Sequence, residues 1–198
     1  MRTSFVPMAL LCLLFMRGEW LEAQNKPLIV EEGRYSIHLL LHTIGTESYT
    51  VTETAPGRMV MTTTSTSSDR GMKRTSSTKL EMGPLFAPVV LEQRSLVSSG
   101  ASGSSGGSAE DVSLTEVTGG GSVTIQERGV SRTMRRPAVA FVGFSTMPAS
   151  LQMMMMRYWR AHHQPARLPI MRASEKALPL EIKLVGHDSF SVQGGWFG

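Results

Sequence analysis

The chain has 198 residues, room for one domain of ordinary size, and carries a net charge of +4. Its only cysteine is Cys12, so a product that has lost this residue can form no disulfide and offers no thiolate. Eight arginines lie in the second half of the chain, but the aromatic residues fall on apolar patterns rather than at exposed positions among them. This argues against a nucleic-acid partner and favours a solvated basic face near an anionic envelope surface.

Residues 1–23 have the layout of a secretory signal peptide. Arg2 supplies the charged start, and Phe5–Met16 form an apolar run of about a dozen residues, too short to span a bilayer comfortably. A small residue, Ala23, marks the expected cleavage site. The sequence therefore predicts export to the periplasm or the extracellular space, with no transmembrane span after removal of the signal.

Residues 24–198 are expected to form a single β-rich domain. Period-two alternation predicts a half-buried strand over Gly33–His42, and turns are expected at Ile44–Glu47 and Ala55–Gly57. The Ser/Gly-rich residues 98–108 predict a flexible loop. Further strands are expected at Ser48–Glu53, Arg58–Ser67, Met72–Met82, Val89–Val97, Asp111–Val117, Ser122–Glu127 and Arg128–Arg136.

Pro148–Gln164 is the one segment expected to form a long helix. Ser145 and Thr146 supply capping hydroxyls, and Pro165 ends the helix because proline disfavours α geometry in the preceding residue. Arg157 lies toward the polar side. An apolar stripe with a period of 3.6 residues defines the other side: Leu151, Met154, Met155, Tyr158, Trp159, Ala161 and His162.

The helix is expected to be enclosed by sheet. Pro137–Phe144 is apolar almost throughout and should be buried beneath it, and strands are expected at Arg167–Met171 and Leu178–Val185. Ser189–Gln193 resembles the first arm of a hairpin with no return strand in Gly194–Gly198, so the domain is expected to be incomplete at its C-terminus. The predicted fold is mainly β (α+β), a curved antiparallel sheet or half-barrel wrapped around one helix in the C-terminal half.

The sequence offers no convincing catalytic constellation. Ser105 lies in a G-x-S-x-G match, but a nucleophile elbow needs a buried strand before it and a helix after it. His38 and His42 fall about 13 Å apart on one expected strand, too far to share a metal ion. His162 and His163 point about 100° apart on a helix. We therefore expect no catalytic residue, no metal ligand and no cofactor, and an independent hydrolase is the least supported interpretation.

A methionine run, Met153–Met156, allows two interpretations. It either fills an irregular β cavity or provides a soft groove for an apolar ligand. In the second case, the expected lining is Phe141, Met154, Met155, Tyr158 and Trp159.

Several segments of the chain resemble one bacterial protein family. These are Asn25–Gly33, Ile44–Tyr49, Gln152–Trp159 with Pro165–Pro169, and Leu180–Lys183 with Val185–Gly186. They are similar to the β-rich amino-terminal region that precedes the metal-dependent hydrolase domain in exported amidohydrolase-like proteins. The H-x-H metal motif of that family is absent here, and its barrel needs about 200 further residues.

Two functions are therefore expected from the sequence. The first is a non-catalytic exported module that packs against or positions a downstream hydrolase domain, as the resemblance implies. The alternative is a stand-alone envelope protein that binds an apolar ligand between sheet and helix.

Overall fold

The computed structural model describes most of the chain beyond the predicted signal peptide. The described residues are 27–99, 109–118, 121–127, 129–144, 147–172, 175–183, 185–186, 190–192 and 195–197. The predicted signal peptide, the central part of the predicted Ser/Gly loop at 100–108, and the predicted capping residues Ser145 and Thr146 lie outside them.

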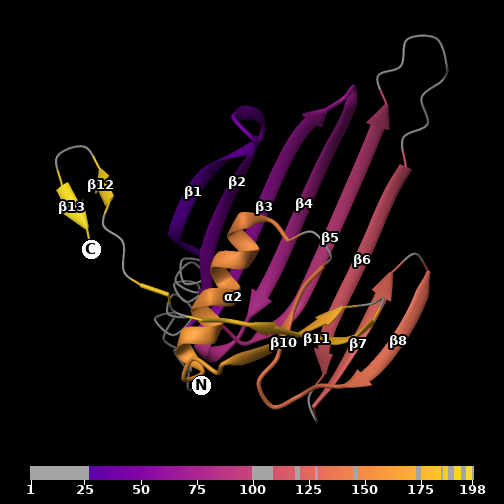
Figure 1. The fold of residues 1–198 in the computed structure, drawn as a ribbon. Helices are drawn as coiled ribbons and strands as arrows, with labels where there is room; N and C mark the ends of the chain where they lie inside the picture. The colour runs from indigo at the N-terminus through magenta and orange to yellow at the C-terminus, as the bar shows by residue number, and fades with distance from the viewer. Residues whose placement is uncertain are drawn as a thin grey trace, which may run out of the picture.

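An antiparallel sheet of eight strands dominates the fold (Figure 1). Each strand pairs with the next one along the chain, and β1 and β8 form the two open edges. The strands are β1 (Leu28–Leu39), β2 (His42–Ala55), β3 (Arg58–Asp69), β4 (Met72–Met82), β5 (Pro88–Ser99), β6 (Ala109–Thr118), β7 (Ser122–Glu127) and β8 (Val130–Arg135). A short 3-10 helix, η2 (Pro84–Phe86), joins β4 to β5.

One helix, α2 (Ala149–Ala161), lies against one face of this sheet (Figure 1). The strands β10 (Arg167–Arg172) and β11 (Glu175–Glu181) cross the same face, and β9 (Phe141–Val142) pairs with β10 in parallel. This arrangement confirms the predicted fold class, a curved antiparallel sheet with one helix. No helix in the described part of the chain is long and apolar enough to cross a membrane.

A single core fills the space between the large sheet, α2 and β9–β11. The sheet contributes Val51, Met61, Leu80, Met82, Leu91, Val123 and Ile125. The covering elements contribute Ala140, Phe141, Val142, Leu151, Met154, Met155, Tyr158, Trp159, Leu168, Ile170 and Met171. The predicted stripe of α2 therefore faces the sheet. The predicted burial of Pro137–Phe144 is confirmed for residues 140–143, whereas Pro137 and Ala138 are exposed.

The first hairpin turns earlier than the sequence indicates. Its tip is Leu40–Leu41, because Leu39 pairs with His42, and the predicted turn at Ile44–Glu47 is wrong. These residues lie inside β2, where a Cβ on Gly45 would come 2.0 Å from the backbone oxygen of Thr66 on β3. Gly45 is therefore a site of close strand packing rather than a turn residue.

The helix is shorter than predicted at both ends. Pro148 is the N-cap residue, and α2 ends at Ala161 rather than Gln164. His162 closes the helix, since its ring nitrogen Nδ1 lies 2.8 Å from the carbonyl oxygen of Tyr158 and its backbone N–H donates to the same oxygen. The chain then enters the left-handed region at His163, with φ 62°.

The predicted absence of a return strand near the C-terminus is also wrong. The strand β12 (Phe190–Val192) pairs with β13 (Gly195–Phe197) in an antiparallel hairpin. Strands of three residues are too short for hydrophobic alternation to reveal.

Candidate functional site: a polar cavity beside the start of the helix

The inward face of the large sheet changes character along its strands. One cross-strand row is mostly apolar, with Val51, Met61, Leu80, Leu91, Thr115 and Ile125 in register. Two residues along each strand, the next inward row is Tyr49, Thr63, Thr78, Gln93, Ser113 and Glu127. The row beyond it carries Tyr35, Glu47, Ser65, Ser76 and Ser95. One part of the inward face is therefore apolar, and the part beside it, formed by the last two rows, carries mostly hydroxyl groups. We call this second part the hydroxyl floor.

The start of α2 lies over the hydroxyl floor. Glu47 on β2 is buried, and its carboxylate accepts hydrogen bonds from the backbone N–H groups of Ala149 and Ser150 at 2.9 and 2.8 Å. The N-cap residue Pro148 makes no side-chain cap. A carboxylate at this position satisfies amides that have no partner within the helix, and it interacts favourably with the helix dipole. Glu47 thus caps the first turn of the helix from the sheet.

A second polar contact fixes the same turn of the helix. The hydroxyl groups of Thr63 on β3 and Ser150 lie 2.6 Å apart, and both residues are buried. Because buried hydroxyls without partners are costly, this pair holds α2 at one position over the sheet.

The uncovered part of the hydroxyl floor forms a cavity of about 600 Å³. Small-molecule sites typically have this size. Sheet residues in its lining are Tyr35, Ser36, Ile37, Glu47, Ser65, Ser67, Arg74, Ser76, Gln93, Ser95, Ser113, Thr115, Ile125 and Glu127. Opposite them lie Gly143, Phe144, Met147, Pro148, Ala149 and Arg172.

Charged and neutral polar groups both line this cavity. Ser65 and Ser76 are a cross-strand pair of the hydroxyl floor, and their hydroxyl oxygens lie 2.7 Å apart. Two basic residues, Arg74 and Arg172, and the acidic Glu127 contribute to the lining, along with Glu47 at the helix start. The formal charges of these four side chains cancel, which suits a neutral or zwitterionic polar molecule better than a strongly charged one.

The structure brings the five sequence-predicted ligand residues together in the core. Phe141 and Tyr158 pack with ring centroids 5.5 Å apart, and the Tyr158 hydroxyl accepts a hydrogen bond from the buried N–H of Ala140. Trp159 donates its indole N–H to the carbonyl oxygen of Pro165 at 2.8 Å. Met154 and Met155 are buried beside them. None of the five lines the cavity.

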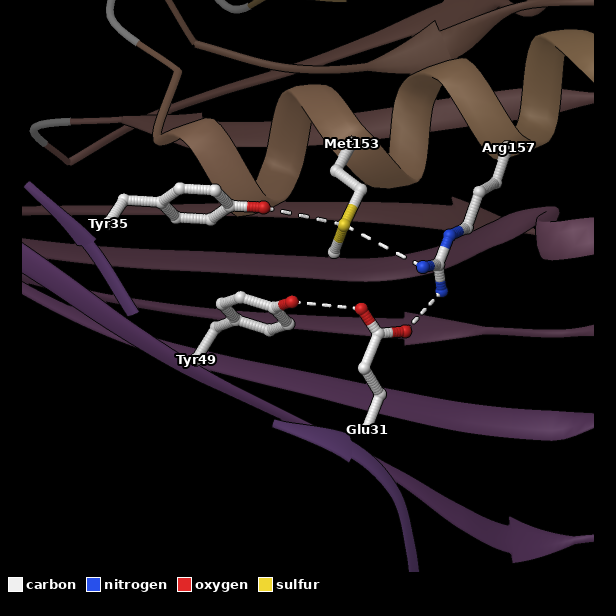
Figure 2. A network of polar contacts seen from close by, with 5 residues as sticks. All are labelled: Glu31, Tyr35, Tyr49, Met153 and Arg157. Carbon is white, nitrogen blue, oxygen red and sulfur yellow. Dashed lines mark hydrogen bonds and ion pairs between the residues drawn. The ribbon is translucent and has the colours of Figure 1, made fainter. Parts of the chain in front are cut away.

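A polar network ties α2 to the first strand (Figure 2). Arg157, which the sequence places toward the polar side of the helix, forms an ion pair with Glu31 at 2.7 Å. Tyr49 donates a hydrogen bond to the other carboxylate oxygen of Glu31 at 2.8 Å, and its ring stacks on Tyr35. The Tyr35 hydroxyl reaches the sulfur of Met153 at 3.5 Å.

The network perturbs two pKa values in opposite directions. The hydrogen bond from Arg157 lowers the pKa of Glu31, and the hydrogen bond from Tyr49 adds to this effect against the opposing effect of burial. Burial raises the pKa of Tyr49, with a further contribution from the neighbouring Glu31 carboxylate. The network therefore favours an ionised Glu31 and a protonated Tyr49.

The candidate chemical residues of the sequence do not converge in the described part of the chain. His38 and His42 lie on opposite strands of the first hairpin, both exposed, and not on one strand as expected. Ser105 lies outside the described residues. Within those residues, no three His, Cys, Asp or Glu side chains are grouped so that they could hold a metal ion.

Sequence reasoning missed the residues that form the cavity and its wall. Ser65 and Ser67 alternate with outward-facing residues on β3, and this period-two pattern could have marked them as one face. Glu47 carries no local signal, because its partners lie more than 100 residues away in the chain. Comparisons with protein-family models, with curated proteins and with solved structures found no match for this chain.

Proposed function

We propose that this chain is a non-catalytic exported β domain that holds a small polar ligand in the cavity between its sheet and the start of α2. The observation that carries the proposal is the hydroxyl floor, which continues past the helix as the lining of an open space of about 600 Å³. Hydroxyl groups both donate and accept hydrogen bonds, so a row of them can match the alternating polar groups of a sugar, a polyol or an amino acid.

The fixed positions of α2 and of the sheet strands around the cavity support the same function. Glu47 and Thr63 hold the first turn of α2, and strands β2–β7 of the floor are paired on both sides. A ligand would therefore meet a preformed surface, which lowers the entropy cost of binding. The side chains of Tyr35 and Phe144 add apolar area against which a ring could pack.

The proposal differs in ligand chemistry from the expectation based on the methionine run. The side chains expected to line an apolar groove pack against one another in the core, whereas the open space lies over serines and threonines. An apolar ligand in that space would leave buried hydroxyl groups without partners, which is unfavourable.

The arrangement of the hydroxyl groups supports binding rather than catalysis. A serine nucleophile needs an adjacent general base. In the described lining, Ser65 contacts Ser76 instead, and the residues around the cavity include neither histidine nor cysteine. The polar groups are suited to orienting a ligand.

A matched pair of substitutions tests this function. Ser95→Trp fills the cavity from its floor, whereas Leu96→Trp places the same side chain on the exposed neighbouring position. Native mass spectrometry of protein purified from the exporting host should show a small polar molecule on the wild type and on Leu96→Trp but not on Ser95→Trp. The proposal fails if the wild type carries no such molecule and if no sugar, polyol or amino acid raises its melting temperature.

A second function, an accessory module that packs against a hydrolase domain, has separate support. The chain resembles the amino-terminal region of exported amidohydrolase-like proteins, and the start of edge strand β1 exposes Leu28, Ile29 and Val30. Exposed apolar residues on an open edge are suited to docking. This function requires a metal-dependent hydrolase encoded together with the chain, so reading the coding sequence around it for an H-x-H barrel tests it. An unrelated neighbouring gene on each side would count against it.

A further inference from the structure

Two hairpin tips project from the same end of the large sheet (Figure 1). The β1–β2 tip is Leu40–Leu41, and the β3–β4 tip is Arg70–Gly71. Because Gly45 of the first hairpin pairs with Ser67 of the second, the two tips extend to a similar level along the strand direction. At about 4.8 Å between neighbouring strands, the tips lie roughly 10 Å apart across the sheet.

The first tip exposes apolar side chains in an unfavourable backbone conformation. Leu40 and Leu41 are 91% and 93% exposed, and Leu39 beside them is also exposed. Leu40 has φ 56°, a left-handed conformation that glycine or asparagine adopts more readily in a two-residue hairpin. Two leucines at such a position neither pack in the core nor favour the turn. Residues held in this way often mark functional sites.

The second tip adds positive charge and another apolar side chain. Arg70, Lys73 and Arg74 are exposed there against a single acidic residue, Asp69, and Met72 is exposed beside them. Apolar side chains flanked by Lys and Arg are the combination that binds the interface of a bilayer containing anionic lipids. A protein partner would be expected to need a broader, shaped apolar surface than two narrow tips provide.

We infer that this end of the sheet is a docking edge for an anionic membrane surface, with Leu40 and Leu41 entering the lipid interface and Arg70, Lys73 and Arg74 contacting lipid phosphates. The inference goes beyond ligand binding and does not depend on it, because the tips and the cavity floor are different residues except for Arg74. The docking edge also differs from the basic surface expected from the arginines of the second half.

A local fluorescence probe tests the geometry directly. In a Cys12→Ser background of the full chain, a bimane label is placed at Leu41→Cys and, as the matched control, at Val185→Cys. Val185 is 93% exposed, like Leu41, but lies far along the chain from both tips. With vesicles of phosphatidylcholine and phosphatidylglycerol, the label at position 41 should shift to the blue and the label at 185 should not. An unchanged spectrum at 41, or equal shifts at both positions, overturns the inference.

Two further variants test separately how charge and apolar area contribute to vesicle binding. A triple variant that combines Arg70→Gln, Lys73→Gln and Arg74→Gln should weaken vesicle partitioning about tenfold or more. Each basic residue near an anionic surface strengthens binding about fivefold. Leu40→Gly with Leu41→Asn supplies a favourable turn sequence, so the hairpin should fold, yet partitioning should fall about tenfold or more. Equal binding to vesicles of phosphatidylcholine alone, or a leucine-dependent dimer without vesicles, would contradict an anionic membrane as the partner.

Discussion

Glu47 binds the backbone N–H of Ser150 at 2.8 Å, although the two residues lie 103 positions apart in the chain. Strand and helix are thereby joined over the hydroxyl floor, on the row that also carries Ser65 and Ser76. Together with the Thr63–Ser150 pair, this contact holds the first turn of the helix in place over part of the hydroxyl floor.

Removing the Glu47 carboxylate should destabilise the protein substantially. Glu47→Ala leaves two amides of α2 without partners, so we expect a loss of about 2–3 kcal/mol in the free energy of unfolding. Glu47→Gln retains one acceptor oxygen and should lose about 1 kcal/mol. Urea unfolding measures both. Glu32→Ala, at an exposed position on β1, is the control and should change stability by less than about 0.5 kcal/mol. Equal losses for Glu47→Ala and Glu32→Ala would exclude the cap.

The buried hydroxyl pair should show a strong interaction energy in a double-mutant cycle. Thr63→Val leaves the fully buried Ser150 hydroxyl without its partner, and we expect a loss of about 1–3 kcal/mol. Replacing both partners, as Thr63→Val with Ser150→Ala, removes the two hydroxyls together and should cost less than the two single changes added. Additive losses, measured by thermal unfolding, would show that the two hydroxyl groups do not interact.

Gly45 should tolerate no side chain. A Cβ at this position would lie 2.0 Å from the Thr66 oxygen, so Gly45→Ala should force β2 away from β3 and cost about 3 kcal/mol. Gly186→Ala is the matched control, because nothing lies within 4 Å of its Cβ position. Chemical denaturation compares the two variants. If Gly45→Ala proves as stable as Gly186→Ala, the close approach of the two strands is wrong.

The Glu31–Arg157 ion pair should make stability depend on pH under acidic conditions. The folded chain holds the pKa of Glu31 below its ordinary value of 4.5. The ion pair therefore stabilises the protein above that pH, and this stabilisation is lost as the pH falls through the lowered pKa. Both side chains are partly exposed, at 28% and 35%, so the effect should be about 0.5–1 kcal/mol.

Comparison of the wild type with Glu31→Gln across this range measures the contribution. The stability difference between them should be present near neutral pH and shrink as the pH falls below 4.5. Arg157→Gln should abolish most of the same pH dependence, since Arg157 is the main cause of the lowered pKa. A difference that does not change with pH would assign the stabilisation to packing instead.

The sequence predicts the fold well where side-chain periodicity is long and regular. The stripe through Leu151, Met155 and Tyr158 correctly predicts the buried face of the helix, and the strand expected at Met72–Met82 is confirmed. Turn residues were less informative. Gly45 suggests a turn by composition but lies in mid-strand, whereas the real tip at Leu40–Leu41 contains two residues that rarely form turns.

The candidate site could be predicted only in part, because it depends on which strand positions the helix leaves uncovered. The period-two hydroxyls of Ser65 and Ser67 could be read from the sequence, but the same pattern suits a solvated face equally well. The cap by Glu47 and the ion pair of Glu31 with Arg157 connect segments that only the folded chain brings together. Local patterns carry no information about such partners.

The volume of the cavity follows from a difference in rise per residue. The 13 residues of α2 extend about 20 Å, whereas the 12 residues of β3 extend about 40 Å, so the helix spans only about half the height of the sheet. One extra helical turn at its start would advance the wall by about 5 Å without altering a single strand. Chains built on this plan could therefore accommodate ligands of different length by changing the helix alone, while the sheet and its core stay the same.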